Sequence, residues 1–154
     1  MIMLERFRKV FNKNIEPLSY EEKVDQERKL EIATCVILLE AATGDSKLSK
    51  EELQKIIELL KEKFQLSDSS VSELIEASKK EREGSTGVWP YTHLINEDLT
   101  IEEKYELMGM IWKVIYSDKT LDEFENYIAH ELLKLLNLDH NKFIELKLKV
   151  KNSI

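Results

Sequence analysis

Residues 30–42 of this chain, Leu-Glu-Ile-Ala-Thr-Cys-Val-Ile-Leu-Leu-Glu-Ala-Ala, decide its fold. This run is apolar on nearly every side of a helix, and it predicts a central, buried helix within residues 20–42. A second apolar stretch, Ile111-Trp112-Lys113-Val114-Ile115, ends a helix that begins at Thr100. The sequence therefore predicts two central helices covered by shorter ones. We expect the core to include Val36, Leu39, Leu59, Leu60, Ile111, Leu132 and Leu133.

The composition favours an all-α fold. Only 4 Gly and 2 Pro interrupt the 154 residues, of which 42% are hydrophobic and 34% are charged. No stretch alternates strictly enough for a strand, and no uncharged run approaches the roughly 18 residues of a membrane helix. We predict one all-α domain over residues 20–154, preceded by a short amphipathic segment, residues 1–19. The expected helices lie near residues 4–11, 20–42, 49–64, 67–80, 100–115 and 122–136 and from 139 onward, with a short turn at 91–95.

The charge distribution bears on the possible partners. A net charge of −7 disfavours nucleic acid as a partner, because proteins that bind it usually gather basic residues on one face. Residues 1–14 are basic, and they suit weak contact with an anionic membrane surface; docking on the bundle or fraying is the alternative. Since this segment lacks the features of a secretory leader, we expect a cytoplasmic protein, either free or peripheral to the inner membrane. The basic residues are Arg6, Arg8, Lys9 and Lys13, and the apolar ones are Leu4, Phe7, Val10 and Phe11.

The two halves of the chain repeat one another. After one residue is dropped from the first half, the alignment extends through the following helix. The repeat predicts two three-helix units, residues 25–83 and residues 99–151, which pair about a pseudo-twofold axis so that each completes the core of the other. The aligned pairs are Asp45 with Asp118, Leu48 with Leu121, Glu52 with Glu125, and then Leu66 with Leu138 and Ser67 with Asp139.

Each half contains an acidic turn with the pattern Asp-x-x-Leu-[Ser/Asp]-x-x-Glu. Carboxylates at this spacing could contribute to a divalent cation site, such as one for calcium, which takes about six to eight oxygen ligands. The same residues also form helix-capping boxes, which need no ion, and this is the simpler interpretation. The residues are Asp45, Ser49 and Glu52 in the first turn and Asp118, Asp122 and Glu125 in the second.

These paired turns resemble the tellurite-resistance TerB family, whose repeated signature, Ala-Asp-Gly-x-Ile-Asp-x-x-Glu, follows a long apolar helix. The resemblance covers residues 25–150, including the aromatic segment at 89–95. It implies an all-helical TerB-like fold, a role in bacterial stress response or metal resistance, and divalent metal binding at the acidic turns. Ser46 and Lys119 replace the glycines of the signature, and Ser49 replaces an aspartate, so the first turn has one carboxylate fewer than the second.

An aromatic cluster, Trp89-Pro90-Tyr91, follows the clearest loop of the chain, residues 84–90. Bulky aromatic residues beside flexible glycines are typical of surfaces that bind a protein partner. The commoner role for Trp89 and Tyr91 would be a plug that closes the interface between the two repeats.

Few other residues suggest chemistry. Cys35 lies in the most apolar helix and is expected to be an inert core thiol, and His130 is expected to be half-buried. The sequence has no phosphate-binding loop and no nucleophile elbow. The preferred hypothesis is a noncatalytic TerB-like protein that acts through a protein partner or weak divalent metal binding. The alternatives are a membrane-peripheral scaffold that uses residues 1–14 and a hydrolase without a recognisable motif.

Overall fold

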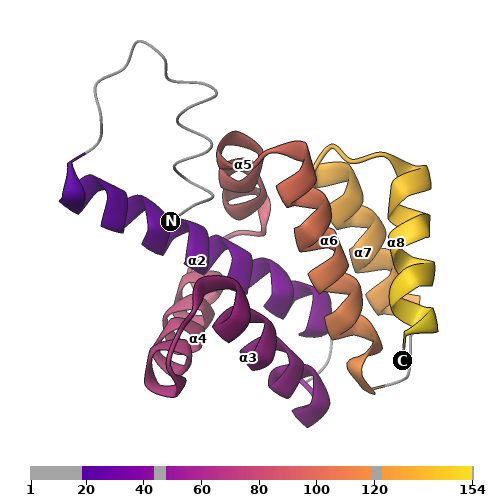
Figure 1. Ribbon diagram of the computed structural model, residues 1–154, viewed down its shortest axis with the longest axis horizontal. Helices are drawn as coiled ribbons and strands as arrows, with labels where there is room; N and C mark the ends of the chain where they lie inside the picture. The colour runs from indigo at the N-terminus through magenta and orange to yellow at the C-terminus, as the bar shows by residue number, and fades with distance from the viewer. Residues whose placement is uncertain (1–18, 44–47, 119–122, 154) are drawn as a thin grey trace.

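The computed structural model describes residues 19–43, 48–118 and 123–153, and every regular element in this part of the chain is helical (Figure 1). The predicted all-α fold is confirmed. The predicted helix at residues 4–11 lies outside the described residues. The elements are α2 (Tyr20–Thr43), α3 (Lys50–Phe64), α4 (Asp68–Glu83), α5 (Trp89–Asp98), α6 (Ile101–Ile115), the 3-10 helix η1 (Tyr116–Asp118), α7 (Glu123–Leu135) and α8 (His140–Asn152).

The helices α2 and α6 occupy the centre of the bundle, as predicted. Helix α2 crosses the molecule and packs against α3, α4, α5, α6 and α7, whereas α6 packs against α2, α3, α7 and α8 (Figure 1). The first turns of α2 extend past the other helices, and there Tyr20 and Val24 are 82% and 45% exposed. Among the described helices, none is both long and apolar enough to cross a membrane.

The core lies where the apolar periodicity predicts it. Each of the seven predicted core side chains is at most 9% exposed, so that prediction is confirmed. The largest fully buried side chains include Trp112 of α6 and Phe143 of α8, whose ring centroids are 4.9 Å apart. Cys35 is also fully buried, and desolvation raises the pKa of its thiol to about 11, as expected of an inert core thiol.

Side-chain caps fix where most of these helices begin. Reciprocal capping boxes start α3, at Ser49 with Glu52, and α6, at Thr100 with Glu103. The N-cap side chains of Ser67 and Asp139 accept backbone hydrogen bonds at the starts of α4 and α8. Each cap satisfies amide groups that have no partner within the first helical turn.

Helix α5 is longer than the turn that the sequence predicts at residues 91–95. It spans ten residues and has Pro90 in its first turn, a position where proline needs no hydrogen-bond donor and its fixed φ suits a helix. A loop followed by proline usually separates helices, and here the proline lies in the first turn of the next helix.

The ends of α3 and α7 have the same left-handed turn. Gln65 and Asn137 occupy matching positions in the two halves, and their φ angles are 54° and 56°. In each turn the next residue, Leu66 or Leu138, donates its amide to the carbonyl five residues back, at 3.1 Å. This hydrogen bond is the one that closes a Schellman helix end. The two turns therefore have the same geometry at positions that the sequence alignment pairs, and the duplication itself stays a prediction.

The two matched turns provide a stability test. We expect Gln65→Gly to raise the free energy of unfolding by about 0.5–1 kcal/mol, because glycine adopts a positive φ without the steric cost that glutamine carries. Asn137→Gly should give a smaller gain, because asparagine already tolerates this conformation. Urea unfolding of the two variants measures the difference. A larger gain at Asn137 would contradict this explanation of the two turns.

Candidate functional site

The first acidic turn leads into α3 through a partly buried capping box. The Ser49 amide donates to Glu52 Oε1 at 3.1 Å, and the Glu52 amide donates to Ser49 Oγ at 3.1 Å. Glu52 is only 2% exposed, and its carboxylate therefore faces the protein. The capping role predicted for these two residues is confirmed. Asp45, the third residue of the predicted set, lies outside the described residues.

The second acidic turn follows α6. Asp118 ends η1, and Glu125 belongs to the first turn of α7. Asp122 and the side chains of Asp118 and Glu125 lie outside the described residues, so metal binding at this turn stays a prediction. Within the part of the chain that the structure describes, no group of three or more His, Cys, Asp or Glu residues is placed to hold a metal ion.

The helices that carry the two acidic turns are in contact. Helix α3 begins directly after the first turn, and η1, which opens the second turn, packs against α3. The beginning of α3 and η1 lie toward the same end of the bundle (Figure 1). The sequence does not predict this proximity, because the two turns are separated by α3 to α6.

Trp89 and Tyr91 have different environments. Trp89 is 62% exposed, which makes the predicted plug role wrong for this residue. Tyr91 is half-buried, packs against the core and lines a hollow of about 670 Å³ together with Ile32 of α2 and Ala77 of α4. The reason is helical geometry: residues two apart on a helix point about 200° away from each other, so only one of them can face the core.

The exposed face of α5 carries an ordered aromatic stack. The rings of Trp89 and His93 are nearly parallel, at 14°, and their centroids are 4.7 Å apart. His93 Nε2 lies 3.2 Å from Glu97 Oε1, one further turn along the helix. Because Trp89, His93 and Glu97 are spaced four residues apart, they form a single row on the outside of α5. The stack on His93 holds the indole of Trp89 in one orientation.

Two of the three histidines meet beside Phe143. The His130 ring lies edge-on to the Phe143 ring at 4.9 Å, and the His130 and His140 rings are 6.0 Å apart. His130 is half-buried, as the sequence predicts. Nothing in the sequence indicates that His140 lies beside it, since the pairing depends on the packing of α7 with α8.

The family assignment comes from comparison with known proteins. The family model described as "Tellurite resistance protein TerB" matches residues 31–148. No curated protein and no solved structure matches the chain. The matched region runs from the middle of α2 into α8 and includes both acidic turns and the whole of α5. Because it spans well over half of the sequence, this chain belongs to the tellurite-resistance TerB family.

Proposed function

We propose that this TerB-family chain is a noncatalytic binding module of a cytoplasmic tellurite-resistance or stress-response system, and that it works by docking a protein partner. The observation that carries the proposal is the exposed indole of Trp89, which is stacked on His93. Large aromatic side chains are enriched among the residues that dominate binding energy at protein interfaces. The face of α5 that bears Trp89 is therefore the proposed contact surface.

The arrangement around Trp89 suits an interface. A side chain that is already held in one orientation loses less conformational entropy when a partner covers it. The loop before α5 borders two hollows. The first, of about 670 Å³, is lined in part by Ser85 and Tyr91, and the second, of about 580 Å³, by Ser85 and Val88. The indole of Trp89 would give a partner an apolar contact, and the neighbouring hollows would receive its side chains.

Photo-crosslinking in living cells tests the contact. Trp89→p-benzoylphenylalanine should crosslink to a defined protein, whereas the same replacement at Tyr127 should not. Tyr127 is a matched control because it is 58% exposed but lies on α7. In cells that lack the native copy, Trp89→Ala should fail to restore tellurite tolerance and Tyr127→Ala should restore it. Equal behaviour of the Trp89 and Tyr127 variants would contradict the proposed surface.

The proposal includes a weak divalent cation site at the second acidic turn. It is supported by the sequence, since Asp118, Asp122 and Glu125 supply three carboxylates, whereas Asp45 and Glu52 supply two. Calcium affinity rises with the charge of the ligand set, so the second turn should dominate binding. Lys119 takes the place of a glycine in the family signature, and its positive charge should keep the affinity low.

Calorimetric titration with calcium, magnesium, manganese and zinc should show at most one appreciable site, and Asp122→Asn should abolish it. Asparagine caps a helix about as well as aspartate, so this substitution removes the charge and keeps the capping that the sequence predicts for residue 122. Binding heat that survives Asp122→Asn but disappears in Asp45→Asn would reverse the ranking of the two turns.

A further inference from the structure

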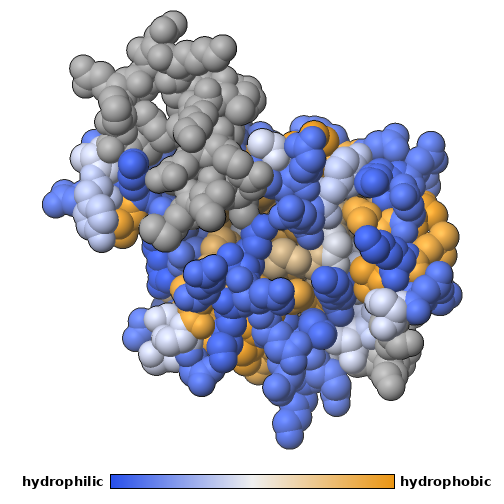
Figure 2. Space-filling model, viewed as in Figure 1, coloured by the Kyte–Doolittle hydropathy of each residue, from blue (hydrophilic) through white to orange (hydrophobic). Residues whose placement is uncertain are grey.

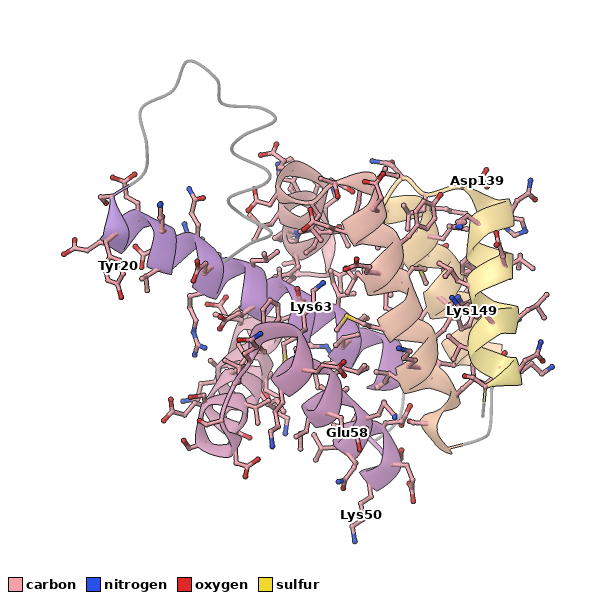
Figure 3. All side chains as sticks on the ribbon, in the orientation of Figure 1. Tyr20, Lys50, Glu58, Lys63, Asp139 and Lys149 are labelled. Carbon is pink, nitrogen blue, oxygen red and sulfur yellow. The ribbon has the colours of Figure 1, made fainter. Side chains whose placement is uncertain are left out.

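A groove runs along the outer face of α6 between α3 and α8. Both α3 and α8 pack against α6, and the space between them has a volume of about 730 Å³. In Figure 3, the labelled Lys63 of α3 and Lys149 of α8 lie on opposite sides of α6. Figure 2 shows apolar surface in the middle of this face, bordered by hydrophilic side chains. The groove shares no lining residue with the Trp89 surface.

The floor of the groove is apolar and contains an unexplained glycine. Leu59, Met110 and Val150 contribute apolar surface from three different helices. Between them lies Gly109, in the middle of α6, where a Cβ atom would meet nothing within 4 Å. Glycine is less favourable than alanine in a helix interior, and the packing of the residues that the structure describes does not require it here. A glycine at this point does allow another backbone to approach α6 closely.

The charges around the groove favour an acidic occupant. Lys63 is already paired with Glu106 at 3.0 Å. Lys113 and Lys149 form no ion pair with any residue that the structure describes, and Glu62 is the remaining carboxylate of the lining. The groove thus has a small positive surplus on a chain whose net charge is −7. The segment at residues 1–14 is basic, so its charge does not complement the positive surplus of the groove.

The shape of the groove fits a helix. Its lining residues on α6, α8 and α3 recur at intervals of three and four positions, so each helix presents one continuous face. A channel along one helix between two others is the geometry that receives an amphipathic helix, with its apolar side down and its charged flanks at the rims. The lining on α6 includes Glu106, Gly109 and Lys113, and the lining on α8 includes Leu146, Lys149 and Val150.

We propose that this groove docks an acidic amphipathic helix of a partner protein, with a small residue against Gly109 and carboxylates beside Lys113 and Lys149. This contact is separate from the one proposed for Trp89. The two proposals can therefore be tested separately. A substitution in the groove that abolishes peptide binding should leave the crosslink at Trp89 unchanged.

Three synthetic helical peptides test the charge preference on the full chain. They share one length and one apolar face with a central alanine, and their flanking positions are all Glu, all Gln or all Lys. Fluorescence anisotropy should show the Glu peptide binding at least tenfold more tightly than the Gln peptide, with the Lys peptide weakest. The double variant Lys113→Glu/Lys149→Glu should reverse this order. Equal binding of the three peptides, or no binding of the Glu peptide, would overturn the proposal.

Gly109→Ala separates docking from folding. It should raise the melting temperature by about 2–4 °C, because alanine favours the helix, and it should weaken binding of the Glu peptide at least tenfold. Ser72→Ala on the exposed side of α4 is the control, and it should leave peptide binding unchanged. Unchanged affinity in Gly109→Ala would refute the close approach. Self-association of the full chain that disappears in Gly109→Ala would assign the groove to a second copy instead.

Discussion

The rest of the structure depends on burying the second half of α2 on every side. From Ala33 to Ala42 the apolar side chains of this helix are at most 1% exposed. A helix that is apolar all round cannot be covered by one neighbour, since each neighbour covers only one stripe. Helices from both halves of the chain, α3 to α7, therefore gather around α2.

The surfaces proposed for binding follow from this arrangement. Helix α5 connects the two halves and covers α2 with one face, so its opposite face is left for Trp89, His93 and Glu97. Helix α6 packs on α2 with its inner side, and α3 and α8 flank it without closing over Gly109. In both cases the inward face is dictated by the core, whereas the outward face is available for partners.

The parts of the fold that the sequence predicts are those set by local signals. Helical periodicity identifies the core, and Ser49, Ser67, Thr100 and Asp139 mark helix starts because capping is a short-range interaction. The opposite orientations of Trp89 and Tyr91 were missed because residues 91–95 were expected to form only a turn. The groove at Gly109 depends on α3, α6 and α8, of which α3 is distant in sequence from the other two. The meeting of His130 with His140 depends on how the consecutive helices α7 and α8 pack across the turn that joins them. No local pattern encodes either arrangement.

Hydrogen exchange measured residue by residue tests most directly whether α2 is the organising element. The backbone amides of residues 33–42 should exchange only when the whole chain unfolds, and their exchange free energy should equal the free energy of unfolding obtained with urea. The amides of residues 20–29 should exchange faster, because this part of α2 extends past the bundle. If residues 33–42 exchanged through a partial opening while α6 stayed protected, α2 would not be the element on which the fold depends.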